Sequence, residues 1–338
     1  MDKIEAKYYC SVDILKFLLS YLICTRHFLQ AVSSPDSILY LLITNIFSTL
    51  GVPLFFIILG FIFFSNKNLD IKKYSLRICM LYLLWSIVYL PLNLFFRIPF
   101  FTLCQNFFFS GFYYHLWFLP SVIFAVFFIY LLRNISVKYL FIFTFFLFLL
   151  ALFSDSYSYI SPFWLNKFYG YYNNIFVTTR NGLFLGSIFV LIGKIFADNV
   201  DHFITCMGGG GGINYLYIIG MLVSLLFLLL EGIILQSINT YQIINVLFFT
   251  LPAVFFIFML TFTSLRDIAY STLVRKMSTV IYCAHPIFII IVRLFTKNVL
   301  NINSFYALLL LFIMVTSFAF LLVKLSNIKK FEFIKYFF

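Results

Sequence analysis

Long apolar segments, separated by short polar stretches, follow one another along the whole chain and limit what it can fold into. A transmembrane helix needs about 20 consecutive, mainly apolar residues. Segments of that kind lie near residues 12–31, 40–64, 75–96, 116–133, 138–154, 180–197, 213–235, 241–263, 277–295 and 304–325. They are too long and too uniformly apolar for the alternating strands of a membrane barrel. We therefore predict an all-α, polytopic integral membrane bundle of about ten transmembrane helices.

The composition excludes a water-soluble domain. Of the 338 residues, 64% are hydrophobic and only 10% are charged, whereas charged residues make up about 25% of a typical soluble domain. One soluble core could not bury 50 Phe residues while showing water a polar coat. The formal net charge of +12 does not indicate nucleic-acid binding, because Lys and Arg fall in short clusters between apolar segments rather than on one water-facing stripe. The lipid bilayer is the expected partner.

The distribution of basic residues predicts the orientation in the membrane. If the N-terminus is cytoplasmic, most of the 23 Lys and Arg residues fall on the cytoplasmic side. The positive-inside rule then places both termini in the cytoplasm, which requires an even number of spans. Residues 1–338 are predicted to form a single transmembrane domain, without a cleavable signal before the first span. The run Gly208–Gly212 is expected to be a flexible inner loop between the sixth and seventh spans.

Cysteine and histidine spacing predicts no metal site. The six Cys residues are scattered, and neither a C-x-x-C pair nor a zinc-type His spacing occurs. We expect structural cysteines and no metal cofactor.

The first predicted span carries polar residues at a helical spacing. Asp13, Lys16, Ser20, Cys24 and His27 fall on one stripe at 100° per residue. Lys16 and His27 are separated by roughly 16 Å along the helix axis. One interpretation is a stripe that lines a passage through the membrane. The other is an ion pair between Asp13 and Lys16 near the inner interface, with the Lys16 side chain extended toward water and His27 at the outer interface.

Other polar residues gather near the two ends of the predicted spans. Those toward the outside are Arg26, His27, His115, Trp117, Arg180, Asn181, Glu231 and Arg293. Those near the inner interface are Lys16, Lys73, Arg77, Arg266, Arg275 and Lys276. Several titratable groups at similar depth favour a cavity, whereas a lone Trp or His at a helix end is more often an interface anchor.

One His lies within the ninth predicted span, in the sequence YCAHP. Pro286 removes a backbone donor and is expected to kink the helix. His285 either forms a hydrogen bond between helices or takes part in function, and the sequence leaves both alternatives open.

The stretch DILKFLLSYLICTRHF resembles the first-span signature of the membrane acyltransferase-3 family. In that signature a basic residue precedes a His, here Lys16 and His27, and an acidic residue such as Asp13 often stands before them. Further segments resemble the family in the same order, namely VPLFFIILGFIFF, KKYSLRICMLYLLW, YHLWFLP, TRNGLFLG and YCAHP. Two positions depart from the family pattern, because Lys16 stands where Arg is commoner and Leu59 where Ser is frequent. Within the family, the chain is most similar to the membrane half of vancomycin-resistance-type serine racemases, through TRNG, Glu231 and the His-Pro segment.

The resemblance implies transfer of an acyl group, usually acetyl, from cytoplasmic acetyl-CoA to a hydroxyl group. The acceptor is expected to be an extracytoplasmic glycan, a peptidoglycan-related molecule or another component of the cell envelope. Localisation in a bacterial inner membrane is expected.

Site roles follow from the resemblance together with side-chain chemistry. His27 is the expected general base or transient acyl carrier, because imidazole titrates near neutrality, and Lys16 and Asp13 complete the predicted catalytic set. Lys73 and Arg77 suit the phosphates of coenzyme A. The residues expected to bind the acceptor are His115, Trp117, Arg180, Asn181, Glu231 and His285.

Two other functions remain open from the sequence. A transporter of an amino acid such as serine, or of a glycan, would use the same intramembrane polar residues. Matched discontinuous helices in two halves would favour transport, and the sequence shows no such symmetry. The third alternative is an inactive scaffold or sensor.

Overall fold

The computed structural model describes residues 10–32, 38–65, 70–206, 215–238, 244–263, 271–296 and 304–338. Within these ranges the regular elements are helices and no strand occurs, which confirms the predicted all-α class. The chain divides into two compact units. Unit 1 comprises residues 1–51, 201–223 and 256–338, and unit 2 comprises residues 52–200 and 224–255.

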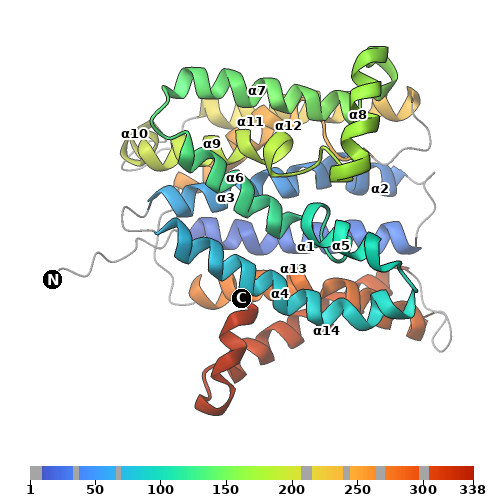
Figure 1. Ribbon diagram of the computed structural model, residues 1–338. Coiled ribbons are helices and arrows are strands. Elements are labelled where there is room, and N and C mark those ends of the chain that lie inside the picture. The colour runs from blue at the N-terminus through green and yellow to red at the C-terminus, as the bar shows by residue number, and fades with distance from the viewer. Residues whose placement is uncertain are drawn as a thin grey trace. The chain divides into compact units, whose positions relative to one another are not determined.

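Unit 1 is built around three long helices. These are α1 (Cys10–Val32), α13 (Ser271–Phe295) and α14 (Ser304–Leu325). α13 packs along both α1 and α14 (Figure 1). The shorter elements are α2 (Ile38–Tyr40), η1 (Leu41–Ile46), η2 (Phe47–Leu50), α10 (Val200–Cys206), η5 (Thr261–Thr263) and η7 (Lys329–Phe337).

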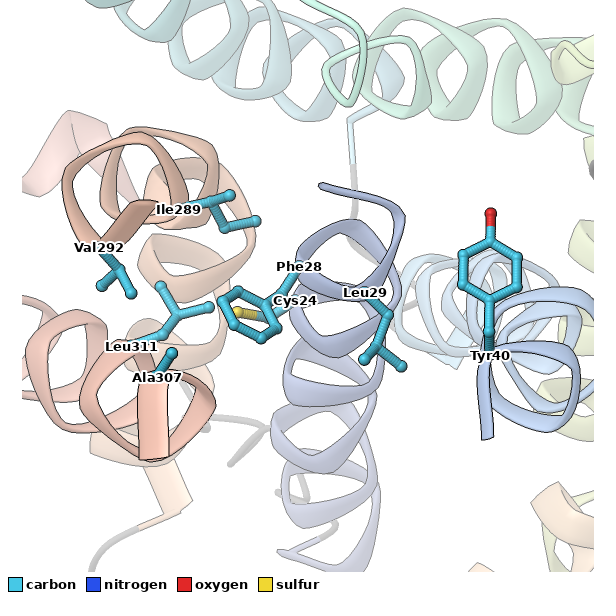
Figure 2. Close-up of a cluster of buried hydrophobic side chains, with 8 residues drawn as sticks. All are labelled: Cys24, Phe28, Leu29, Tyr40, Ile289, Val292, Ala307 and Leu311. Carbon is cyan, nitrogen blue, oxygen red and sulfur yellow. The ribbon is translucent and has the colours of Figure 1, made fainter. Parts of the chain in front are cut away.

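A buried apolar cluster joins the three long helices of unit 1. In Figure 2, Cys24 and Phe28 of α1 point toward α13 and α14, and both are completely buried. The cluster consists of Cys24, Phe28, Leu29, Tyr40, Ile289, Val292, Ala307 and Leu311. Between helices in a bilayer, close packing of this kind rather than the hydrophobic effect supplies most of the attraction. The cluster therefore holds α1, which carries the polar stripe, against α13.

Unit 2 is centred on α6 (Phe118–Leu131), which packs against α4, α9 and η4. Its other elements are α3 (Gly51–Ser65), α4 (Ile71–Phe95), α5 (Phe100–Phe109), α7 (Val137–Ser154), η3 (Ser158–Ile160), α8 (Phe163–Phe176), η4 (Gly182–Gly186) and α9 (Ser187–Asp198). Helices α3 and α9 approach closely, because a Cβ atom on Gly193 would lie only 2.3 Å from the Ile57 carbonyl oxygen. α11 (Tyr215–Ile238) and α12 (Thr250–Leu260) contribute residues to both units.

Six helices in the described part of the chain are long and apolar enough to cross a membrane. They are Leu41–Ser65, Ile71–Phe95, Val137–Ser154, Tyr215–Ile238, Thr272–Phe295 and Ser304–Leu325. The bent pair Gly182–Asp198 and Val200–Cys206 would make a seventh if it is counted as one span. The membrane class is thus supported, whereas the count of ten spans is not confirmed and the cytoplasmic location of both termini stays a prediction.

The remaining expected spans coincide with helices that fall short of the criteria for a span. In the described residues of the segments expected at 116–133 and 241–263, the apolar helices are the shorter Phe118–Leu131 and Thr250–Leu260. α1 has 23 residues, but its polar stripe makes it less apolar than the six. The predicted inner loop at Gly208–Gly212 lies outside the described residues.

Candidate functional site

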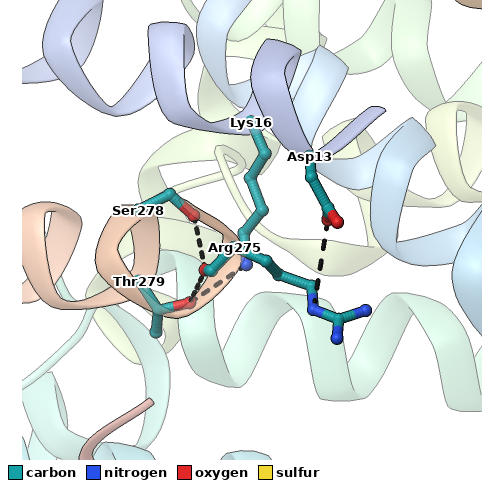
Figure 3. A network of polar contacts seen from close by, with 5 residues as sticks. All are labelled: Asp13, Lys16, Arg275, Ser278 and Thr279. Atoms are coloured by element: carbon teal, nitrogen blue, oxygen red, sulfur yellow. Dashed lines mark hydrogen bonds and ion pairs between the residues drawn. The ribbon is translucent and has the colours of Figure 1, made fainter. Parts of the chain in front are cut away.

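The polar stripe of α1 faces α13 in unit 1 (Figure 3). The Lys16 ammonium donates a hydrogen bond to the Thr279 hydroxyl over 3.0 Å. The Asp13 carboxylate lies 4.0 Å from Nε of Arg275, and Asp13 itself is buried. The Thr279 hydroxyl in turn points at the carbonyl of Arg275, one turn earlier in α13. Both predicted catalytic residues at this end of α1 are therefore held by side chains of α13.

The middle of the stripe is packed rather than open. Ser20 and Cys24 are completely buried, and the Ser20 hydroxyl donates to the Phe17 carbonyl of its own helix over 2.6 Å. A serine that bonds to its own backbone in this way satisfies its hydroxyl without a partner helix. The stripe thus lies against α13 with polar contacts at both ends, and the two interpretations of its role stay predictions.

His27 occupies the far end of the stripe. Its Nδ1 atom lies 3.1 Å from Oε1 of Gln30, one turn further along α1. With the Gln30 amide oxygen as the acceptor, Nδ1 is the donor of this pair, and in that tautomer the lone pair of neutral His27 is on Nε2. A lone pair of this kind is what a general base requires.

The ring of His27 stacks on the ring of His285 in α13. Their centroids are 5.3 Å apart and their planes differ by 15°. His285 is completely buried. Its Nδ1 atom lies 2.7 Å from the Tyr282 carbonyl oxygen, to which it donates. The sequence assigned His285 to the acceptor, and the structure brings it together with His27 within unit 1.

In unit 2, the segment from Thr178 to Gly182 forms a turn held by its own side chains. Asn181 accepts hydrogen bonds from the backbone of Leu183 and Phe184, and its amide donates to the Tyr172 hydroxyl over 2.8 Å. Gly182 is required there because a Cβ atom would lie 2.1 Å from the Ser121 carbonyl oxygen. Asn181 therefore caps η4 and holds the turn, a role that an N-cap Asn commonly fills.

This turn brings Arg180 over Trp117. The guanidinium carbon lies 5.1 Å from the centre of the Trp117 rings, a cation–π contact. Burial lowers the pKa of Arg180, and the charge of the Asp155 carboxylate opposes that shift. The residues predicted from YHLWFLP and TRNG thus meet in space.

His115 lies in an aromatic setting in the same unit. It is buried, and its ring makes edge contacts with Tyr89, Tyr113 and Tyr114 at centroid distances of 5.0, 5.9 and 5.6 Å. Tyr89 stacks on Tyr113 at 4.4 Å. Aromatic faces next to polar groups are suited to the apolar faces and hydroxyls of a sugar, so a role in acceptor binding stays a prediction for this group.

Glu231 has three donors within the protein. It accepts hydrogen bonds from the Tyr157 hydroxyl over 2.6 Å and from the backbone N–H groups of Phe248 and Phe249. These two N–H groups immediately precede α12, where unpaired donors attract a carboxylate. Burial raises the pKa of Tyr157, and the bond to Glu231 raises it further. Glu231, which lies in α11, therefore joins this helix to the segment after α7 and to the start of α12.

Lys73 and Arg77, predicted to bind coenzyme A phosphates, lie one turn apart in the exposed first part of α4. The Asp70 side chain caps this helix by accepting from the Lys72 backbone over 2.8 Å. Within the described ranges, no group of three His, Cys, Asp or Glu residues could hold a metal ion.

Sequence comparison identifies the family. Residues 10–324 match the model of the acyltransferase domain known as acyltransferase-3. The chain belongs to the acyltransferase-3 family. The predicted resemblance to this family is confirmed, and the roles of the predicted site residues stay predictions.

Two curated relatives of this acyltransferase-3 chain are amino-acid racemases of Enterococcus faecalis. One is 28% identical over 305 residues, which cover 83% of this chain and 41% of the racemase. The other is 27% identical over 208 residues, covering 58% of this chain and 29% of the racemase. The chain thus spans less than half the length of these relatives. No solved structure matches it.

Proposed function

We propose that this acyltransferase-3 protein moves an acetyl group from cytoplasmic acetyl-CoA to a hydroxyl of an extracytoplasmic glycan or another cell-envelope acceptor. The cell membrane of a bacterium is the proposed location. The observation that carries the proposal is the contact of His27 Nδ1 with the Gln30 amide oxygen, because the tautomer that donates there has its lone pair on Nε2. Family membership supports acyl transfer, and this imidazole supplies the base that the chemistry needs.

In the proposed reaction, Nε2 of His27 takes the proton of the acceptor hydroxyl. The hydroxyl oxygen attacks the carbonyl carbon of the acetyl thioester, forming a C–O bond as the C–S bond breaks. The proton then passes from His27 to the departing thiolate. The products are an O-acetyl ester and coenzyme A, so atoms and charge balance without an oxidant or a metal.

Lys16 and Arg275 are the cations proposed to meet the negative charge of the donor or of the transition state. The Lys16 ammonium is positioned by the hydrogen bond that it donates to the Thr279 hydroxyl. Asp13, buried beside Arg275, is proposed to orient that guanidinium. The exposed Lys73 and Arg77 are proposed contacts for the phosphates, and His115, Trp117 and Arg180 for the acceptor.

The function is tested with purified protein in lipid vesicles and acetyl-labelled CoA. The wild type should release CoA and transfer or hydrolyse the acetyl group, and His27→Asn should lower the rate by at least about a hundredfold. His202→Asn is the matched control, because His202 is an exposed side chain of α10, and this variant should keep the wild-type rate.

Equal rates in the wild type and His27→Asn would contradict the proposed role of His27. If acetyl-CoA neither binds nor turns over, acyl transfer from this donor is excluded and transport becomes the leading function. Uptake or efflux of serine by the same vesicles, without any acyl donor, would then be the next measurement.

A further inference from the structure

The sequence His-Pro in α13 affects one particular backbone carbonyl. In an α-helix, the N–H group of each residue donates to the carbonyl four residues earlier. Pro286 lies within α13 and has no N–H group. The carbonyl that this missing donor would have served is that of Tyr282.

The side chain of His285 supplies a hydrogen to that same carbonyl. Nδ1 of His285 lies 2.7 Å from the Tyr282 oxygen. A carbonyl oxygen only accepts, so the hydrogen of neutral His285 is on Nδ1. Pro286 and His285 therefore act as a pair, in which the proline withholds the helical donor and the imidazole replaces it.

This replacement bond gives the His285 ring a fixed orientation. The ring is held at Nδ1 by the backbone, it is completely buried, and one face lies along the ring of His27. His27 is held separately at its own Nδ1 by Gln30. The Gln30 contact holds His27 at its Nδ1 atom, and stacking on the His285 ring limits rotation of the His27 ring.

We propose that His285 is a positioning residue for His27, locked in place because Pro286 leaves the Tyr282 carbonyl to its side chain. This proposal rests on the proposed role of His27 as the base and goes beyond it, because it assigns His285 to the alignment of that base rather than to acceptor binding. A base that is rotated or displaced by as little as 1 Å loses a large part of its rate advantage.

The first test is a double-mutant cycle in acetyl transfer. Pro286→Ala restores a backbone N–H that competes for the Tyr282 carbonyl, and it should lower kcat roughly tenfold with the KM for acetyl-CoA unchanged. His285→Phe keeps a flat ring without the donor and should cause a similar loss. In the double variant the proline change should have no further effect, because its action passes through the His285 side chain.

A matched control separates this role from general helix bending. Pro91 also lies inside a helix, α4, but follows a leucine rather than a histidine. Pro91→Ala should leave kcat unchanged. If the effects of Pro286→Ala and His285→Phe are instead independent and multiply, the proline acts through the helix alone and the proposal is overturned.

The second test does not depend on activity. In protein labelled with ¹⁵N at its four His residues, NMR should show His285 with its hydrogen on Nδ1 in the wild type and a mixture of tautomers in Pro286→Ala. A hydrogen on Nε2 in the wild type, or an unchanged ring in the variant, would overturn the lock. If the spectra agree but no protein transfers acetyl, the proposed function has failed while the lock stands.

Discussion

Lys16 of α1 and Thr279 of α13 lie 263 positions apart in sequence and share a hydrogen bond of 3.0 Å. The bond joins the residue that begins the predicted family signature to a hydroxyl in the helix that also carries His285. The Thr279 hydroxyl also lies 3.4 Å from the Arg275 carbonyl oxygen, so the Lys16 ammonium is held against this turn of α13. The arrangement suits a cation that must meet negative charge at a defined place.

Replacing Lys16 with Met tests whether this charge is used in the reaction. Lys16→Met keeps most of the apolar stem but removes the ammonium, and acetyl transfer should fall by about a hundredfold. Thr279→Val removes only the hydroxyl that holds the ammonium, and the fall should be smaller, about tenfold or less. Initial rates of CoA release measure both. Full activity in Lys16→Met would show that the lysine is a helix-packing contact.

Gly182 should tolerate no side chain. In Gly182→Ala the new Cβ atom would meet the Ser121 carbonyl at 2.1 Å, so the turn that carries Arg180 must shift. We expect a loss of about 1–3 kcal/mol in unfolding free energy, typical of overpacking. Thermal unfolding in detergent measures the change.

Gly170 provides the control for this substitution. It lies within α8, and a Cβ atom there would meet no atom within 4 Å. Gly170→Ala should raise stability slightly, because alanine favours a helix by about 0.5–1 kcal/mol over glycine. Equal unfolding temperatures for the two variants would contradict the close approach at Gly182.

The raised pKa of Tyr157 predicts that the folded protein loses stability at alkaline pH. Burial and the bond to Glu231 raise the pKa of this phenol in the folded chain, so the folded protein keeps a proton that the unfolded chain releases above about pH 10. The stabilisation that this proton contributes is fully present below about pH 10, and it is lost as the pH rises toward the pKa of Tyr157 in the folded chain.

Unfolding temperatures between pH 8 and pH 11, chosen to bracket the ordinary tyrosine pKa of about 10, measure this effect. Above about pH 10, the unfolding temperature of the wild type should fall more steeply with pH than that of Tyr157→Phe. Tyr139→Phe, which changes an exposed tyrosine, should follow the wild type. Parallel curves for the wild type and Tyr157→Phe would exclude a stabilising proton at this site.

Local periodicity was sufficient to predict that the polar residues of α1 share one face. Asp13, Lys16 and His27 fall on one stripe at 100° per residue, and their contacts lie on α13. Long apolar segments likewise predict helices, because uniform hydrophobicity over about 20 residues leaves few other structures in a bilayer.

Contacts between distant segments could not be predicted in the same way. Nothing near His27 in the sequence indicates that its ring stacks on His285, and nothing near Glu231 indicates Tyr157 as its donor. These pairs depend on how the helices pack, which composition does not encode. Gln30 carried a local signal that sequence reasoning missed, since it follows His27 by three residues, the spacing at which helical side chains meet.

Helix ends and irregular helices were also poorly predicted. The polar, aromatic segment at 155–179 lies between two expected spans, and it contains α8 (Phe163–Phe176). Pro162 directly before this helix supplies the fixed backbone angle that helix starts favour. The apolar segment at 241–263 was expected to be a full span, yet within its described residues 244–263 the α-helix is Thr250–Leu260.

The most direct test of the central claim is single-turnover reaction of acetyl-labelled CoA with the protein in sealed vesicles, comparing the wild type with His27→Ala. With His27 as the base, label should leave CoA in the wild type and appear on an added hydroxyl acceptor or in water, and His27→Ala should leave the label on CoA. Equal loss of label from CoA in both proteins would contradict acyl transfer through His27.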